Sequence, residues 1–136
     1  MLAIRLTCDR LGELAEQMHD KASEAVRATA FAIQDRAQAL APVDTGALRN
    51  SHYAATRQGS GYGDAAQAAA RANPEVPLLP EVSAPRDDMT AIVAVGAEYG
   101  MHVEYGTKRQ PPRPYLTPAA ESMRYEFTQA MTRLLA

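Results

Sequence analysis

Residues 9–40 carry one continuous helical pattern, and this stretch limits the folds open to the chain more than any other. The pattern predicts one amphipathic helix or two in series. One continuous helix would span about 45–50 Å, which is longer than one small domain needs. It therefore either bends, near His19 and Asp20, or projects toward a neighbour. The apolar positions recur at steps of three and four, as on one face of an amphipathic helix: Leu11, Leu14, Met18, Ala22, Ala25 or Val26, Thr29, Ile33, Ala37 and Leu40.

Three short segments have the composition and alternation of strands. Residues 2–7 alternate apolar and other side chains, which predicts a strand with one buried face. Residues 50–57 and 90–96 are expected to pair as antiparallel strands, and the second is rich in Val and Ile. A C-terminal helix should follow Ala119, with an apolar stripe of Met123, Phe127, Met131 and Leu134 or Leu135.

Residues 58–89 separate the two paired strands and are too many for a hairpin loop. Glycines at its start are typical of a hinge, and an Ala-rich helix is expected from Asp64 to about Ala72. Four prolines then impose extended geometry around Val76, Leu78 and Leu79. This apolar segment needs a surface to lie on, and two surfaces stay open: its own domain or a neighbouring subunit.

Length and composition predict one domain over residues 1–136, with residues 58–89 as an inserted extension. The formal charge of −2 is weak evidence against duplex binding as the main activity. The single cysteine, Cys8, excludes an internal disulfide and a multi-cysteine zinc site. Neither a signal peptide nor a membrane span is indicated, so we expect a cytoplasmic protein unless it leaves within a particle.

The sequence contains only fragments of known catalytic or ligand-binding motifs. The pair His102 and Glu104 matches a fragment of the zinc deaminase signature, but the cysteines that must come after it are missing. Gly59, Gly61 and Gly63 lack the frame of a phosphate-binding loop. No set of nucleophile, base and orienting group is evident. We therefore expect no enzyme, no metal and no cofactor.

Two segments carry sequence motifs that composition alone does not explain. The first comes after the long helix, where Pro42 ends it; Asp44, Thr45 and Gly46 are expected to form a turn and Leu48 to anchor it in the core.

The second segment is residues 99–120, where Gly106 breaks a short apolar-aromatic stretch. Four prolines, including Pro114 and Pro118, stiffen the second half of this segment. Thr117 is the expected N-cap of the last helix. The basic residues Lys108, Arg109 and Arg113 leave three interpretations open: a solvated loop, an acidic partner protein, or DNA phosphates.

The two segments resemble the tail-completion, or minor tail, proteins of long-tailed bacteriophages. The first segment contributes the motif Pro42-Val-Asp-Thr-Gly-Ala-Leu-Arg49. The second contributes Val103-Glu-Tyr-Gly-Thr107 and Arg113-Pro-Tyr-Leu-Thr-Pro-Ala119. The resemblance covers most of the chain outside residues 58–89, and it depends on order and spacing as well as local matches.

The resemblance implies an α+β fold. A long N-terminal helix and a C-terminal helix would pack on a small, mostly antiparallel twisted sheet, with the Pro/Ala-rich insertion between two strands. It also implies a nonenzymatic virion protein that is assembled in the host cytoplasm. Such proteins form a hexameric ring in the phage neck, between the head-side connector and the tail tube or tail terminator.

Carried over by position, most motif residues would be structural. Arg49, Glu104 and Arg113 would form a hydrogen-bond network or a contact between subunits. The departure from the family pattern is the insertion, which we expect to reach an adjacent subunit or ring. The alternative function is a small nucleic-acid-binding module that uses Lys108, Arg109 and Arg113 together with Tyr105 and Tyr115.

Overall fold

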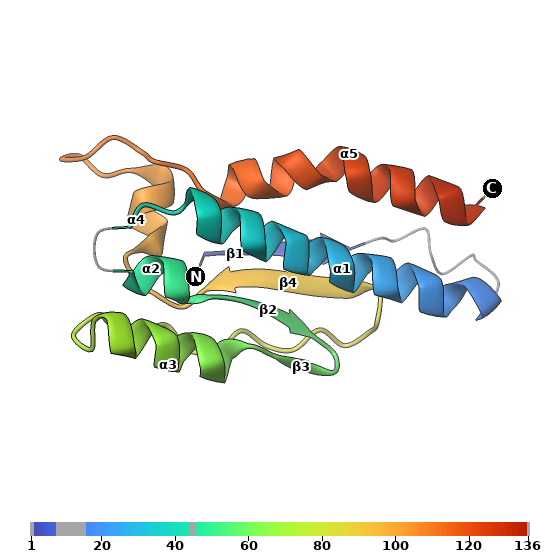
Figure 1. The fold of residues 1–136 in the computed structure, drawn as a ribbon, viewed down its shortest axis with the longest axis horizontal. Helices are drawn as coiled ribbons and strands as arrows, with labels where there is room; N and C mark the ends of the chain where they lie inside the picture. Colours follow the sequence, from blue (N-terminus) through green and yellow to red (C-terminus); the bar gives the residue numbers. More distant parts are fainter. Residues whose placement is uncertain (1, 8–15, 44–45, 136) are drawn as a thin grey trace.

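The computed structural model describes residues 2–7, 16–43 and 46–135, and it has two long helices packed on a four-stranded sheet (Figure 1). All strand pairs are antiparallel, in the order β1-β4-β2-β3. The predicted α+β class is therefore confirmed. In chain order the elements are β1 (Ala3–Thr7), α1 (Glu16–Leu40), α2 (Ala47–Asn50), β2 (His52–Thr56), β3 (Gly59–Ser60), α3 (Tyr62–Ala72), β4 (Thr90–Val95), α4 (Gly100–Tyr105) and α5 (Leu116–Leu135).

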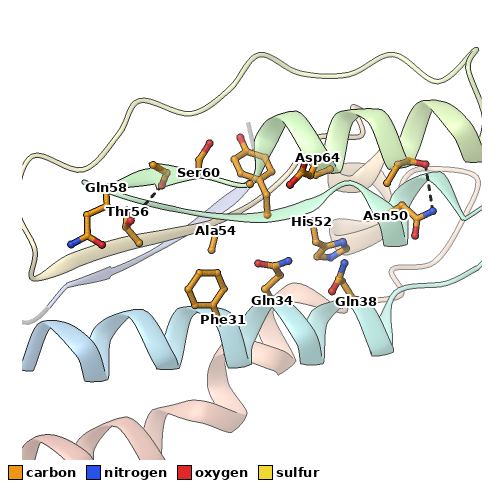
Figure 2. A pocket seen from close by; sticks show the side chains of 15 residues that line it. Phe31, Gln34, Gln38, Asn50, His52, Ala54, Thr56, Gln58, Ser60 and Asp64 are labelled. Atoms are coloured by element: carbon orange, nitrogen blue, oxygen red, sulfur yellow. Dashed lines mark hydrogen bonds between the residues drawn. The ribbon is translucent and has the colours of Figure 1, made fainter. Parts of the chain in front are cut away.

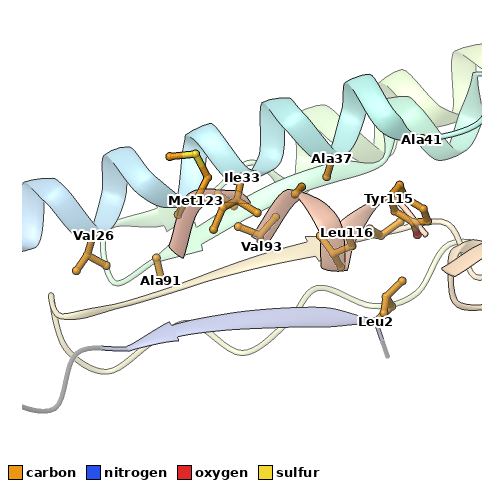
Figure 3. Close-up of a cluster of buried hydrophobic side chains, with 14 of the residues drawn as sticks. Leu2, Val26, Ile33, Ala37, Ala41, Ala91, Val93, Tyr115, Leu116 and Met123 are labelled. Atoms are coloured by element: carbon orange, nitrogen blue, oxygen red, sulfur yellow. The ribbon is translucent and has the colours of Figure 1, made fainter. Parts of the chain in front are cut away.

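The strand β4 is buried on both faces because helices cover one face and the insertion covers the other. Ala91, Val93 and Val95 pack in one cluster with side chains of α1 and α5 (Figure 3). Successive strand residues point to opposite faces. Ile92 and Ala94 accordingly join a second cluster on the other face. The continuous Val/Ile run that predicted this strand reflects its double burial.

The helix α1 is one unbroken helix over Glu16–Leu40, which confirms the helical pattern for its described part; residues 9–15 lie outside the described residues. Five of its stripe positions are buried: Ala22, Val26, Thr29, Ile33 and Ala37. Small residues on this stripe allow α5 to approach, and Met123, Phe127, Met131 and Leu134 of α5 pack in the same cluster. Leu40, the last stripe position, is instead 52% exposed because the chain leaves the core there.

The insertion lies on the back face of its own sheet, opposite α1 and α5. Val82 and Ala65 are buried there against Tyr53 and Ile92. The hydroxyl of Tyr53 accepts a hydrogen bond from the Val82 amide at 3.1 Å. The apolar segment whose surface the sequence left open also lies on its own domain, since Val76 packs against the main core cluster and Leu78 pairs with Ala97. The glycine-rich start of the insertion contains a short strand that the sequence did not predict, because Gly59 and Ser60 form β3.

Candidate assembly surfaces

The segment after β4 forms a compact projection at one end of the molecule (Figure 1). Helix α4 ends at Tyr105. The next residue, Gly106, has a φ of 77°, and a Cβ there would lie 2.7 Å from the nitrogen of Pro112. The loop of residues 107–113, here called the basic loop, then folds back. Its ends are tied where the Arg113 amide donates to the Val103 carbonyl at 2.8 Å. Only glycine fits this junction without strain.

Within the basic loop, the Thr107 hydroxyl accepts the backbone amides of Arg109 and Gln110, each at 3.2 Å. The Thr107 amide donates to the Gln110 carbonyl at 2.9 Å. Lys108 and Arg109 are exposed at this closed turn. The loop therefore presents positive charge from an ordered backbone rather than from a flexible tail.

Glu104 holds the projection to the start of α5. Its carboxylate accepts the backbone amides of Tyr115 and Leu116 through Oε2, at 2.7 and 3.1 Å, and that of Thr117 through Oε1, at 2.7 Å. The amides of Leu116 and Thr117 belong to the first turn of α5, where they have no partner within the helix, and Tyr115 is the residue just before it. Helix α5 begins at Leu116, so the predicted N-cap at Thr117 was wrong. Glu104 caps the helix from another element instead.

The charge state of Glu104 depends on these hydrogen bonds, since the residue is only 3% exposed to water. Burial by itself raises the pKa of a carboxyl group. Hydrogen bonds from Thr117, Tyr115 and Leu116 outweigh that effect and bring the pKa of Glu104 below its ordinary value. The carboxylate is therefore ionised at neutral pH, and its negative charge faces the positive end of the helix dipole.

Tyr115 lies in the core and not on the surface, with no exposed area. Its hydroxyl donates to the Gly100 carbonyl at 2.9 Å, and a Cβ on Gly100 would come within 2.7 Å of that hydroxyl. Its ring meets His52 edge to face, with centroids 5.3 Å apart. Tyr115 therefore cannot stack on a nucleic-acid base in this structure, which removes one element of the alternative function.

His52 is a buried neutral histidine. Its Nδ1 lies 3.0 and 3.2 Å from the carbonyls of Leu48 and Arg49, so Nδ1 must carry the proton. Nε2 is buried without a hydrogen-bond partner among the described residues. Burial lowers the pKa of His52 to about 4, although the two carbonyl contacts and the charge of Glu104 act in the opposite direction.

The first motif forms the junction between α1 and β2. Asp44 and Thr45 lie outside the described residues, whereas Gly46 has a φ of 84° and precedes α2. Leu48 is 1% exposed. Arg49 is half-buried, and its Nε donates to the Gln38 backbone carbonyl at 3.0 Å. In return, the side-chain Nε2 of Gln38 donates to the Arg49 backbone carbonyl at 3.2 Å. Arg49 therefore ties α2 to α1 within the chain.

Four large apolar side chains are exposed at the end of the molecule that carries α4, and we call them the end surface. They are Leu40 (52%), Val43 (52%), Met101 (41%) and Tyr105 (66%). The basic loop extends from the same end (Figure 1). Pro114 is exposed in the segment that leads back to α5, and Pro118 is exposed in the first turn of that helix. An apolar patch beside positive charge is typical of a protein-binding surface.

The apolar side chains singled out in the insertion are half-buried. Leu78 forms an isolated antiparallel bridge with Ala97, and the Leu79 amide donates to the Gly96 carbonyl at 2.7 Å. Val76 packs against the main core cluster. The backbone of this Pro-rich segment is thus fixed to the residues just after β4, while part of its apolar surface faces outward.

A groove of about 580 Å³ runs between α1 and α3 beside β2 (Figure 2). Polar amides line it, including those of Gln34, Gln38 and Asn50, and Phe31 is 51% exposed at its rim. The residues of β2 beneath it, His52, Tyr53 and Ala54, are 2–4% exposed. The floor is therefore closed, and the strand edge below it is not accessible.

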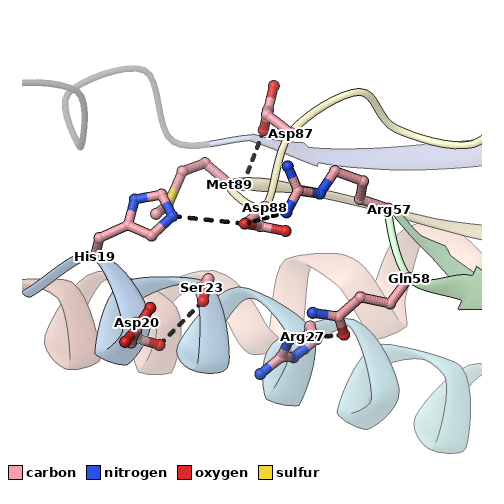
Figure 4. Close-up of polar contacts among 9 residues, drawn as sticks. All are labelled: His19, Asp20, Ser23, Arg27, Arg57, Gln58, Asp87, Asp88 and Met89. Atoms are coloured by element: carbon pink, nitrogen blue, oxygen red, sulfur yellow. Dashed lines mark hydrogen bonds and ion pairs between the residues drawn. The ribbon is translucent and has the colours of Figure 1, made fainter. Parts of the chain in front are cut away.

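A small charged cluster lies at the end of the molecule opposite the end surface (Figure 4). Asp88 lies 3.0 Å from Arg57 and 3.6 Å from His19, and its side chain is 20% exposed. Asp87 accepts the Met89 amide at 2.8 Å. This cluster joins the start of β4 to β2 and α1, so it is a structural contact.

The described residues contain no group of three or more side chains placed to bind a metal ion. Across the same residues, no helix has the length and apolar character needed to cross a membrane. The described residues thus form a small protein with an ordered projection and an exposed apolar end.

Comparison with known protein families gives the class of protein. The family model described as "Bacteriophage HK97-gp10, putative tail-component" matches residues 7–106. The chain therefore belongs to the HK97-gp10-like family, a family of nonenzymatic structural tail components of phage virions. The match includes the first motif and extends to Gly106, whereas the basic loop and α5 lie outside it. No curated protein and no solved structure matches the chain significantly.

Proposed function

We propose that this chain forms a ring, hexameric in the particle, in the neck of a long-tailed phage. There it completes the tail and joins it to the head-side connector. Its neighbours are the connector or closure protein on one side and the tail tube or tail terminator on the other. DNA passes through the lumen without sequence-specific binding. Membership in a phage tail-component family is the observation that carries this proposal.

The end surface supports a joining role. Leu40, Val43, Met101 and Tyr105 expose apolar area at one end of an elongated molecule. Isolated exposed apolar side chains are ordinary on a protein surface, but four at one end favour a docking site. Since Glu104 and Gly106 fix α4 and the loop, Met101 and Tyr105 of α4 lose little backbone entropy on binding.

The basic loop supports an acidic protein partner. Lys108 and Arg109 extend beyond the end surface on an ordered turn, and the chain as a whole has a formal charge of −2. A local positive patch on an overall acidic protein sets the orientation of docking. We assign these residues, with Arg113, to the contact with the next component of the neck.

The insertion contributes a second contact in this proposal. Val76, Leu78 and Leu79 are half-buried on an ordered backbone, and we assign their outward area to an adjacent subunit. Deleting the insertion would not test this contact alone, because Val82 and Ala65 also cover the sheet. Leu78→Ser keeps the backbone bonds and removes the apolar side chain; normal ring assembly by this variant would exclude the contact.

Electron microscopy of particles made without this protein tests the joining role. We expect filled heads beside separate tails of full length, and complementation with the wild-type gene should restore whole particles. A ring of six copies should then be visible in intact necks. Complete infectious particles without the protein would refute the proposal, and tails of abnormal length would indicate tail termination instead.

A further inference from the structure

The strand β1 is an accessible edge of the sheet. It pairs with β4 at all five positions without a bulge, and the order of strands leaves its other side without a neighbour among the described residues. The Val95 amide donates to the Leu2 carbonyl, so alternation directs the backbone groups of Leu2, Ile4 and Leu6 toward β4. Those of Ala3, Arg5 and Thr7 therefore point outward, and these three residues are exposed.

Hollows flank this edge on both faces of the sheet. The front hollow, about 420 Å³, lies between β1 and the two long helices. Its lining combines apolar side chains, among them Ile4, Leu6, Met123 and Phe127, with polar and charged residues that include Thr29, Glu121 and Arg124. The back hollow, about 350 Å³, is lined by Ala3, Arg5, Val82, Ser83 and Ile92. A strand added beside β1 would place alternate side chains into these two hollows.

Natural proteins usually protect such edges with charges, prolines, bulges or a covering element. Here β1 has no proline and no bulge, and Arg5 is its one charged side chain. Arg5 lies on the back face of the sheet, since it is paired with Ile92. An incoming strand would meet a regular backbone, a front hollow of mixed apolar and polar lining, and a positive charge at the back.

We propose that β1 receives an extended segment of another virion protein by strand addition. The segment carries apolar side chains that enter the front hollow and an acidic side chain that lies beside Arg5. Backbone hydrogen bonds to Ala3, Arg5 and Thr7 supply affinity, and the alternating side chains supply specificity.

A second copy of this chain does not fit the site through its described residues. Two β1 strands that pair antiparallel about Arg5 would place the two arginines opposite each other, which is destabilising. The other edge of the sheet offers only the two residues of β3, while His52, Tyr53 and Ala54 of β2 are buried. The charge of Arg5 therefore disfavours this pairing of two copies and favours a strand with an acidic side chain from a different protein.

This inference depends on the family assignment and not on the neck ring. It concerns a site on the isolated chain, so it is tested with purified protein. A failure there leaves the particle experiment unaffected, and the reverse also holds.

The test uses the synthetic peptide acetyl-Thr-Val-Glu-Val-Thr-amide at millimolar concentration and residue-resolved amide hydrogen exchange. We expect the peptide to slow exchange at Ala3, Arg5 and Thr7 and to leave Ile4 and Leu6 unchanged, because their amides already face β4. No slowing at the three outward amides would overturn the proposal. Slowing that depends on protein concentration without peptide would assign the edge to a second copy and would also overturn it.

A charge exchange tests the role of Arg5. Arg5→Glu should weaken binding of the Glu peptide roughly three- to tenfold and should favour the matching peptide with Lys in place of Glu. Arg71→Glu makes the same charge change on the exposed surface of α3 and should alter neither affinity. Equal binding of both peptides by wild type and Arg5→Glu would overturn the assigned contact with an acidic side chain.

Discussion

The carboxylate of Glu104 lies 2.7 Å from the backbone amide of Tyr115, eleven residues further along the chain and just before α5. Through this contact α4 caps α5. The same carboxylate takes the next two amides of α5. One side chain thus satisfies three amides that would otherwise be buried or partly buried without a partner. It also fixes the base of the projection that we assign to docking.

Glu104→Gln should lower the free energy of unfolding by about 1–3 kcal/mol. The amide of Gln keeps one acceptor oxygen, but it loses the charge and the second acceptor of a charge-assisted network. Urea denaturation at pH 7 measures the loss. Glu121→Gln, an exposed carboxylate on α5, is the matched control and should stay within about 0.5 kcal/mol of wild type.

The stability difference between wild type and Glu104→Gln should depend on pH. The pKa of Glu104 is lower in the folded chain than in the unfolded chain, so the unfolded chain binds more protons in acid. Its contribution is complete above the unfolded pKa and is lost as pH falls through the folded pKa. The stability difference between wild type and Glu104→Gln should therefore shrink in acid. A difference that stays constant from pH 7 to acid would contradict the assigned ionised cap.

His52 should make the protein sensitive to mild acid. Its pKa is about 4 in the folded chain and near 6.5 when unfolded, so protonation favours the unfolded chain as pH falls through this interval. Full stability is present above pH 6.5, and about 3 kcal/mol should be lost by pH 4. His52→Leu should abolish this part of the slope, whatever its absolute stability. His102→Gln, an exposed histidine, should keep the slope.

Periodicity predicted the layered fold because the core imposes it. The stripe from Ala22 to Ala37 and the Val/Ile run of β4 record burial directly in the sequence. Leu40 continues the stripe but is exposed, because periodicity does not mark where a helix leaves its core. The two-residue strand β3 is too short to give any periodic signal.

Contacts between distant segments could not be predicted in the same way. Glu104 was singled out only as a charged motif residue, and its capping role requires a helix start brought near it by the fold. The residue three positions after Thr117 is Ala120, which cannot complete a capping box, and this was the available signal that another group caps α5. Val82, which covers the back of the sheet, sits among prolines with no pattern that names its partner.

Gly106→Ala should destabilise the projection. The residue has a φ of 77°, and the added Cβ would contact Pro112 at 2.7 Å from nitrogen, so we expect a loss of about 1–3 kcal/mol. Gly63→Ala is the control, since Gly63 lies in α3 with open space around a new Cβ. It should leave stability unchanged or raise it by up to about 1 kcal/mol. Thermal unfolding of the two variants compares them directly.

Tyr105→Ser should impair particle assembly without unfolding the protein. Tyr105 is 66% exposed on the end surface, so removing its ring leaves no cavity but takes apolar area from the proposed docking site. Tyr125→Ser is the matched control, because Tyr125 is 71% exposed on α5, away from that end. Infectious titre and electron micrographs of complemented particles measure the effect. We expect at least a tenfold loss of titre for Tyr105→Ser, as for an interface side chain worth about 1.4 kcal/mol, and wild-type titre for Tyr125→Ser. Equal titres for the two variants would remove the end surface from the joining contact.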